Sequence, residues 1–413
     1  MITLFEVQEP EIYFKSSENM EELENNSIQL ILTSPPYGKI KNYGGSEEQI
    51  GYYDSFEEYF LRLTNVWKEC YRVLEPQCRL IINIGDQYLR KSKFGRYRIL
   101  PIFSQIINDC QNIGFDYLGD IIWQKISTTN TTGGCSLMGS IYYPRNGLLT
   151  FDYEHILIFK KHEGKGRTID RRRKELSKIS LSEWKKWYIG HWKFPGIVQK
   201  EHIAMFPEEL PYRIIRMFSL IDDNVLDPFV GSGTTLKVAK ALFRKGIGYE
   251  INESYKNTIE TKVKEGIIGY FKDYQFLLFS MFQKAMDRHF KISFEKQKQK
   301  GILILESKNG TELILDYMLF NSGTINTSPI LRELEIKLEE NTLQNYLKGK
   351  DGWANFNKYI IIVNSHSYSE NKRIKKCFIN HLEELQLAKK IEIFSFEEFI
   401  SEENKIVELF GLI

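Results

Sequence analysis

A short polar loop stiffened by two prolines is the first feature of this chain that could do chemistry. Thr33-Ser34-Pro35-Pro36-Tyr37 directly follows the largely apolar run Ile28 to Leu32, which is typical of a buried strand. Proline fixes its own φ angle and favours extended conformations in the residue before it, so this loop is rigid. A rigid backbone beside a hydroxyl group and an aromatic ring indicates a site for a planar ligand.

A second loop has the composition of a nucleotide-binding turn. Val225-Leu226 indicates a short strand, residues 227–233 (Asp-Pro-Phe-Val-Gly-Ser-Gly) a loop, and Thr234 to Phe243 a helix. This order brings backbone N–H groups and a helix N-terminus toward a ligand, which glycine allows to approach closely. The loop lacks the Gly-Lys-Ser/Thr ending of a P-loop and the third glycine of the dinucleotide fingerprint. By itself it is equally compatible with a tight turn that binds nothing.

Two carboxylates make the second loop more specific. Asp227 ends the strand before the loop, and Glu250 ends the next strand, Ile247 to Glu250. A carboxylate after the second strand binds ribose hydroxyl groups in nucleotide folds, whereas Asp227 can face a cationic amino group. S-adenosylmethionine carries both a ribose and an ammonium group. We therefore predict that it is the cofactor.

Together the two loops resemble the catalytic and cofactor motifs of the DNA amino-methyltransferases, which modify exocyclic nitrogens. The catalytic motif precedes the cofactor motif here, with a basic segment between them, and this order is similar to that of the permuted beta class. His202 to Glu208 matches the short motif that precedes the cofactor loop in this class and helps to line the methionine pocket. The resemblance covers residues 10 to 265.

The resemblance implies a role for each matching residue. It implies catalysis by Ser34, Pro35, Pro36 and Tyr37, with Tyr37 stacked on a base that is flipped out of double-stranded DNA. It implies binding of the cofactor by a set around the second loop: Phe206, Asp227, Phe229, Gly231, Ser232, Gly233, Thr234 and Glu250.

The serine of the first loop indicates which base is modified. Ser34 stands where the resembling N4-cytosine enzymes usually have serine and the N6-adenine enzymes Asp or Asn. The resemblance thus implies methyl transfer to N4 of cytosine, with N6 of adenine as the alternative, in a restriction-modification system beside a cognate restriction endonuclease. Ser34 Oγ and the Pro35 carbonyl would accept the two amino hydrogens and favour a pyramidal nitrogen.

No covalent intermediate is needed for transfer to an amino group. The carbon-5 cytosine methyltransferases need a nucleophilic cysteine after a proline, and Pro76-Gln77-Cys78 has the wrong order and lies beside a strand. We interpret Cys78 as a core residue.

Positive charge is concentrated between residues 160 and 200. This segment holds thirteen Lys or Arg against four Asp or Glu, a balance of +9, in a chain of net charge +2. Such a patch is the electrostatic footprint of a polyanionic partner. We predict that Arg171, Arg172, Arg173 and Lys174 bind DNA. The alternative is a solvated charged loop.

These motifs need a sheet to position them, and the sequence pattern predicts one. Apolar strand-like runs alternate with helical stretches such as Phe56 to Leu74 and Ile102 to Ile113. The predicted fold is α/β: an S-adenosylmethionine-dependent methyltransferase (Rossmann-like) sheet in permuted motif order, with an inserted target-recognition region and a small C-terminal α/β domain. The predicted division is 1–159 and 201–268 for the catalytic and cofactor-binding parts of the methyltransferase domain, 160–200 for the target-recognition region and 269–413 for the accessory domain.

The last part of the chain allows more than one interpretation. Gly301 to Phe320 predicts a hairpin, Lys358 to Val363 a strand and Asn371 to Lys390 a helix. Asp316 and Glu335-Ile336-Lys337 are similar in type and order to the metal-binding core of the PD-(D/E)xK nucleases, so a fused nuclease is an alternative. We favour an accessory domain, since Glu-x-Lys is common by chance. Binding of DNA or RNA without chemistry would leave the complete cofactor loop unexplained.

Composition excludes other classes of protein. The 413 residues are 42% hydrophobic and 27% charged, as in soluble globular proteins, and no apolar run approaches the ~20 residues that span a bilayer. Met1 to Glu6 show no secretory signal, so we expect a cytoplasmic protein without a membrane partner. We predict no metal site, because the five cysteines are scattered and never form a Cys-x-x-Cys pair: Cys70, Cys78, Cys110, Cys135 and Cys377.

Overall fold

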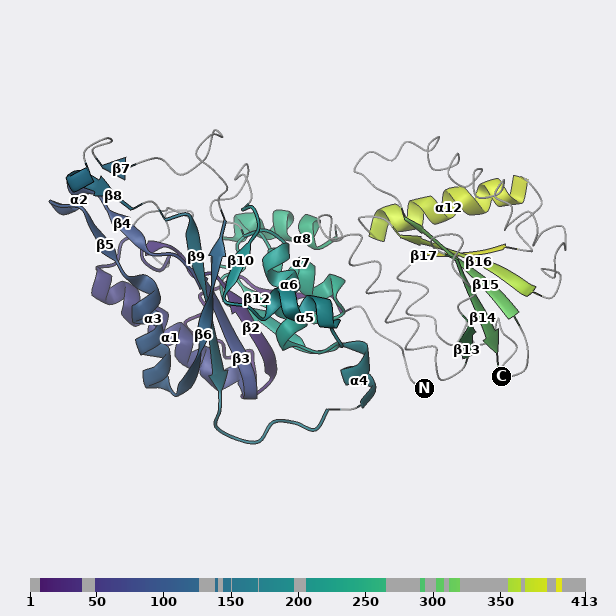
Figure 1. Cartoon of the computed structure of the whole chain (residues 1–413), viewed down its shortest axis with the longest axis horizontal. Helices are drawn as coiled ribbons and strands as arrows, with labels where there is room; N and C mark the ends of the chain where they lie inside the picture. The colour runs from purple at the N-terminus through teal and green to yellow at the C-terminus, as the bar shows by residue number, and fades with distance from the viewer. Residues whose placement is uncertain are drawn as a thin grey trace. The chain divides into compact units, whose positions relative to one another are not determined.

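The computed structural model describes two groups of segments. The first comprises residues 8–38, 49–125, 138–139, 144–149, 151–169, 171–196 and 206–264, and the second comprises 290–293, 302–307, 312–319, 356–364, 368–384 and 391–395. Gln8–Val263 forms one compact unit, and residues from Lys264 onward belong to another (Figure 1). Among the helices so described, none is long and apolar enough to cross a membrane.

The first unit is built on an eight-stranded mixed sheet. In spatial order its strands are β1 (Glu11–Tyr13), β12 (Lys245–Tyr249), β11 (Asn224–Asp227), β2 (Ile28–Thr33), β3 (Leu74–Ile84), β9 (Tyr153–Lys161), β6 (Phe115–Gln124) and β10 (His191–Lys193). Strand β9 is antiparallel to both its neighbours, and all the other strands of this sheet share one direction. The sheet therefore has a carboxyl edge, where seven strands end, and an amino edge, where β9 ends.

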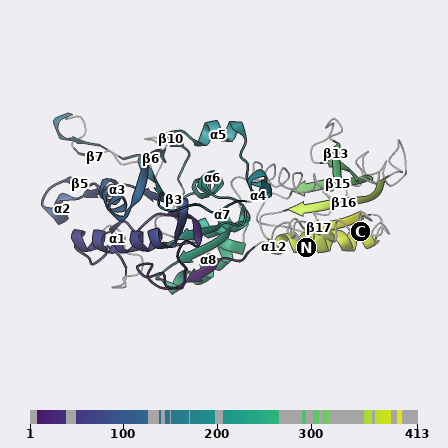
Figure 2. The ribbon, with the colours of Figure 1, turned by 90° about the horizontal axis from the view of Figure 1, so that it is seen from below.

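Helices cover both faces of this sheet. They are α1 (Phe56–Val73), α3 (Ile102–Ile113), α4 (Arg171–Leu176), α5 (Leu181–Trp187), α6 (Glu209–Phe218), α7 (Thr234–Ala241) and α8 (Lys256–Lys264), the last preceded by the short helix η3 (Glu253–Tyr255). Figure 2 shows α1 and α6 on opposite sides of the strands. All six residues of β2 are buried, as expected for a central strand covered on both faces.

Helix α1 begins at a capping box that its sequence encodes. Ser55 accepts a hydrogen bond from the Glu58 backbone N–H at 3.1 Å, and the Glu58 carboxylate accepts one from the Ser55 N–H at 2.7 Å. Both bonds satisfy donors that the first turn of a helix leaves unpaired. The cap fixes where the apolar face of α1 starts and so aligns that face with the sheet.

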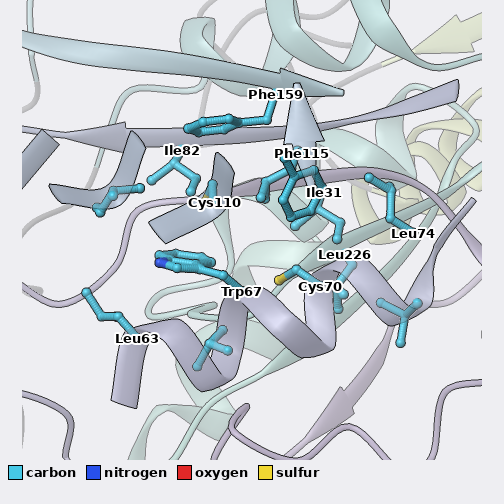
Figure 3. Close-up of a cluster of buried hydrophobic side chains, with 14 of the residues drawn as sticks. Ile31, Leu63, Trp67, Cys70, Leu74, Ile82, Cys110, Phe115, Phe159 and Leu226 are labelled. Carbon is cyan, nitrogen blue, oxygen red and sulfur yellow. The ribbon is translucent and has the colours of Figure 1, made fainter. Parts of the chain in front are cut away.

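A large core cluster of the described residues lies between α1, α3 and the sheet (Figure 3). Trp67 of α1 is fully buried in it, next to residues of β2, β3 and α3 such as Ile31, Ile82 and Cys110. The Trp67 ring also meets the Phe229 ring edge-on, with 6.4 Å between centroids. The core thus packs directly against the loop that follows β11.

Small elements extend from the carboxyl edge. Strands β4 (Gln87–Leu89) and β5 (Arg98–Leu100) pair antiparallel around helix α2 (Lys91–Phe94), and strands β7 (Met138–Gly139) and β8 (Gly147–Leu148) pair around the short helix η2 (Pro144–Asn146). Figures 1 and 2 both show α2, β5 and β7 together at one end of this unit.

The second unit has a five-stranded sheet of its own. Its order is β13 (Phe290–Ser293), β14 (Ile302–Ser307), β15 (Glu312–Leu319), β16 (Phe356–Asn364) and β17 (Ile391–Ser395), and helix α12 (Tyr368–Glu384) packs on β16 and β17. The antiparallel pairing of β14 with β15 confirms the predicted hairpin. Asp316 lies in β15, whereas Glu335 and Lys337 lie outside the described residues.

Candidate active site

A cavity opens at the carboxyl edge of the sheet, where β2, β11 and β12 end. It encloses about 880 Å³ of space, open solvent included. Strand β2 leads through α1 to β3 on one side, and β11 leads through α7 to β12 on the other, so the loops after β2 and β11 diverge from neighbouring strands. Ligands of open α/β sheets bind at such a switch point.

The cavity brings together the two loops that sequence analysis singled out. Its lining includes almost all the predicted catalytic and cofactor-binding residues: Ser34, Pro35, Pro36, Tyr37, Phe206, Asp227, Phe229, Gly231, Ser232, Thr234 and Glu250. Gly233 belongs to the same loop and begins α7. Phe206 represents the predicted motif His202 to Glu208, whose first four residues lie outside the described residues.

Residues 33–37, which we call the catalytic loop after their predicted role, are bonded to β9 through Tyr37, and Ser34 lines the cavity. The Tyr37 hydroxyl donates to Glu154 Oε1 at 2.9 Å, and Glu154 also binds Lys125 and accepts from Asn83 Nδ2 at 2.7 Å. Within the described part of the chain, Ser34 Oγ has no hydrogen-bond partner. The geometry therefore fixes the aromatic ring at its far end and leaves the serine oxygen available to a ligand.

Asp227 connects the catalytic loop to residues 227–233, which we call the cofactor loop after their predicted role. Its Oδ1 accepts from Thr33 Oγ1 at 2.7 Å and from the Phe229 N–H at 3.0 Å, and its Oδ2 accepts from Thr235 Oγ1 at 2.6 Å. Its side chain is buried, and this burial raises the pKa of Asp227 although the three hydrogen bonds act in the opposite direction. A carboxylate accepts about four hydrogen bonds, so Asp227 has room for one from a ligand.

The cofactor loop presents backbone rather than side-chain groups. Gly231 and Gly233 have φ angles of 54° and 85°, which glycine adopts without strain, and a Cβ on Gly233 would lie 2.9 Å from Ile259 Cγ2. The hydroxyls of Ser232 and Thr234 accept from Lys262 Nζ at 2.7 and 2.8 Å. Both side chains are therefore tied back to α8.

Glu250 directly follows β12 and lines the cavity. Strand β11 lies between β12 and β2, so Glu250 and the catalytic loop flank the end of β11. Glu250 Oε2 accepts from the Gly231 N–H at 2.8 Å and its Oε1 from the Asn252 N–H at 2.9 Å. Burial raises the pKa of Glu250 to about 7, and the nearby Asp227 charge adds to the shift. Each oxygen keeps a lone pair for a ligand hydroxyl group.

The structure adds residues that sequence analysis missed. Lys15, Ser16 and Ser17 follow β1 and line the cavity, as do Tyr249 and Tyr255. Ser17 is 2% exposed, and its Oγ has no hydrogen-bond partner in the structure as described. A buried hydroxyl without a partner is costly, so Ser17 fits a polar ligand group. Strand β1 has only three residues and gives little periodic signal.

The predicted DNA-binding residues do not reach this cavity. Strand β9 runs against β3, with Lys160 opposite Arg79, so residues after Lys161 emerge at the amino edge. Arg173 of α4 donates there to the Ile221 carbonyl at 2.8 Å and pairs with Asp223 at 2.8 Å, just before β11. Arg171 and Lys174 are exposed at that edge, and the side chain of Arg172 is outside the description. The structure thus separates Arg171–Lys174 from the catalytic loop by the length of the sheet.

Cys78 also lies away from the cavity, in the first half of β3. It is partly buried against the main core, and burial raises the pKa of its thiol to about 12. A thiol of that pKa is protonated near neutral pH and is a poor nucleophile. These properties agree with the interpretation of Cys78 as a core residue.

Three comparisons with known proteins agree with this geometry. The DNA methylase family model N6_N4_Mtase matches residues 28–261. The Type II methyltransferase M.MjaI of Methanocaldococcus jannaschii is 36% identical over 281 residues, 61% of this chain and 90% of the relative. M.HpaI of Haemophilus parainfluenzae is 32% identical over 260 residues, 61% of this chain and 73% of the relative.

A solved structure extends the similarity to the fold. TTHA0409 of Thermus thermophilus, in complex with S-adenosyl-L-methionine, is 29% identical, covers 63% of this chain and 95% of its own, and has a TM-score of 0.51. The predicted α/β methyltransferase sheet is thereby confirmed. Since the family model spans more than half of the sequence and both of its loops line one cavity, the chain belongs to the N6/N4 DNA methylase family.

Proposed function

We propose that this protein transfers a methyl group from S-adenosylmethionine to the exocyclic N4 of cytosine at specific sites in double-stranded DNA. The observation that carries the proposal is Ser34, which faces the cavity with a free oxygen in a loop bonded through Thr33 to the cofactor loop. The Type II relatives support a restriction-modification setting with a cognate endonuclease.

The cavity has the groups that S-adenosylmethionine requires. Glu250 can accept hydrogen bonds from both ribose hydroxyls, and the Ser17 hydroxyl lacks the partner that a polar ligand group would supply. Phe206 and Phe229 offer apolar walls. Asp227 is the acceptor for the ammonium group through its remaining lone pair. When bound, the cofactor supplies an electrophilic methyl group.

The catalytic loop acts by orientation and electrostatics. Ser34 Oγ and the Pro35 carbonyl accept the two hydrogens of the cytosine amino group, which localises its lone pair and directs it at the methyl carbon. The target base must leave the duplex to reach this loop, and Tyr37 stacks on the flipped base. N6 of adenine is the alternative target, because the same acceptors suit its amino group.

Tyr37→Ala is expected to lower kcat/KM for DNA about 5- to 150-fold. The reason is the loss of base stacking, which contributes roughly 1 to 3 kcal/mol. Tyr37→Phe keeps the ring and removes the hydroxyl that donates to Glu154, so it should cost less than tenfold. Steady-state kinetics on one duplex, with cofactor affinity by calorimetry, separates these effects. An alanine variant as active as the phenylalanine variant would mean that the base does not stack on Tyr37.

The affinity for S-adenosylmethionine should rise about tenfold between pH 6 and pH 8. Glu250 has a pKa of about 7, and its ionised form is the stronger acceptor for ribose hydroxyls. Its effect on the stability of the free protein has the opposite sign: the raised pKa stabilises the fold below about pH 4.5, and this contribution is lost as the pH rises through about 7. Titration calorimetry on wild type and Glu250→Gln tests this, since the variant should show a flat profile. A pH dependence that persists in Glu250→Gln contradicts the assignment.

The experiment that tests the proposed function is nucleoside analysis. Genomic DNA is incubated with the protein and radiolabelled S-adenosylmethionine, then digested to nucleosides and separated. Label in N4-methylcytosine supports the proposal. Label in N6-methyladenine would instead show that adenine is the target base. Cofactor binding without labelled DNA contradicts the proposed reaction.

A further inference from the structure

A second basic surface lies beside the candidate active site. The segment Gln87–Leu100, which we call the basic arm, consists of β4, α2 and β5. It carries five basic side chains and no acidic one: Arg90, Lys91, Lys93, Arg96 and Arg98. All five are exposed, and none of them forms an ion pair with another residue that the structure describes. The basic arm therefore has a local charge of +5 that no acidic group among the described residues compensates by an ion pair.

The basic arm starts at the same edge of the sheet as the catalytic loop. Strands β2 and β3 are parallel, with Thr33 opposite Ile82, so the residues after each strand emerge side by side. A Cβ placed on Gly38 would lie 3.7 Å from Gln87 Oε1. Gln87, the first residue of the arm, therefore lies next to Gly38, the residue that follows Tyr37.

Aromatic contacts anchor the basic arm while its charges face solvent. The Phe94 ring stacks on Phe56 of α1 with 5.7 Å between centroids, and the Tyr88 ring stacks on Phe151 with 5.0 Å. Leu89 is only 3% exposed. The arm is thus a fixed support for its charged side chains.

We propose that the basic arm binds the sugar–phosphate backbone of duplex DNA next to the target base. The inference rests on the proposed function, because that function brings a duplex to the catalytic loop. Any duplex whose base enters the cavity lies across the carboxyl edge, where the arm stands. Lysine and arginine neutralise phosphates and fix the register of the protein on DNA without reading its sequence.

The geometry favours the basic arm over the helix that sequence analysis singled out. Arg171–Lys174 are at the amino edge, and Arg173 is bound to Asp223 and a carbonyl group. Among the described residues, the arm combines unpaired charges with a position next to the catalytic loop. Both surfaces offer exposed cations, so each can serve as the control for the other.

The test compares two double variants of equal charge. Lys91→Ala/Lys93→Ala removes two charges from the basic arm, and Arg171→Ala/Lys174→Ala removes two from the amino edge. The affinity for a duplex of fixed sequence is measured between 50 and 200 mM salt. The slope of log K against log salt should shrink by about 1 to 2 in the arm variant, since each phosphate contact contributes roughly 0.9. The control variant should keep the wild-type slope.

Further measurements keep the outcomes distinct. Both variants should bind S-adenosylmethionine with wild-type affinity, which shows that they are folded. An unchanged slope in the arm variant overturns the proposal, and so does a changed slope in the control variant alone. If the wild-type protein methylates DNA and the arm variant keeps the wild-type salt slope, only the proposed role of the basic arm is refuted. A wild type that forms no methylated nucleoside, but whose salt slope depends on the arm, refutes only the proposed reaction.

Discussion

Asp227→Ala is expected to weaken the binding of S-adenosylmethionine at least 100-fold and to reduce methyl transfer in parallel. The substitution removes the acceptor of three buried hydrogen bonds, from Thr33, Thr235 and the Phe229 N–H. Each buried donor left without a partner costs about 1 to 3 kcal/mol. Both loops at the cavity lose their common support, so cofactor affinity and turnover should fall together. Calorimetry for the cofactor and initial rates on a duplex measure the two effects.

Asp227→Asn is the matched control. The asparagine oxygen can keep the bonds from Thr33 and Phe229, and its amide can donate to Thr235 once that hydroxyl rotates. We expect the melting temperature to stay close to that of wild type and affinity to fall only about tenfold, from loss of a charge-assisted contact. If the asparagine variant loses as much affinity as the alanine variant at equal melting temperature, the charge facing the ligand matters more than the connection between the loops.

Trp67→Ala is expected to destabilise the methyltransferase unit by about 3 to 5 kcal/mol, as is usual for a buried Trp truncated to alanine. Trp67 is completely buried in the cluster beneath α1 and α3 (Figure 3). Because typical domains are stable by only about 5 to 15 kcal/mol, this is a large share of the total. Its ring also contacts Phe229, so the cofactor loop should loosen as well. Urea denaturation with and without S-adenosylmethionine measures both consequences.

Trp67→Phe isolates the packing contribution. The indole Nε1 of Trp67 is buried without a hydrogen-bond partner in the described structure, so its removal carries no lost bond. The phenyl ring keeps much of the buried area, and the cost should stay below that of alanine. A phenylalanine variant as unstable as the alanine variant would show that the core depends on the full size of the indole.

The residues of the cavity were predictable because their motifs are local. Ser34 and Tyr37 follow the buried strand β2, whose apolar run is visible in the sequence. Gly231 lies in the glycine-containing loop after β11, and Glu250 directly follows β12. What joins them is adjacency of β2 and β11 at one edge, which the Rossmann-like prediction implies. Ser17 was missed, since the three-residue strand before it has no periodicity.

Charge counting alone does not locate a basic segment on the fold, because it ignores strand direction. Residues 160–200 have the higher count, yet β9 is antiparallel, so the residues directly after Lys161 emerge at the amino edge, where α4 lies. Strand β10, near the end of this segment, runs back toward the carboxyl edge. Several of the cations in this segment form bonds within the protein: Arg173 pairs with Asp223, and Lys161 donates to the Leu74 carbonyl. The basic arm has fewer charges in a shorter segment. It follows β3, which is parallel to β2, so the arm begins at the edge of the sheet where the cavity opens. Strand direction thus places α4 and the basic arm at opposite edges of the sheet.

The hydrogen bond from Thr33 to Asp227 joins residues 194 positions apart in the sequence. They meet because β2 and β11 are neighbours in the sheet, with Leu30 opposite Val225. The chemistry therefore depends on which strands touch and is indifferent to which is synthesised first. A circularly permuted chain, with new ends between the two loops and the old ends joined, would therefore form the same pocket. The pocket therefore needs the contact between β2 and β11, whereas the order of the two loops along the chain is free to vary.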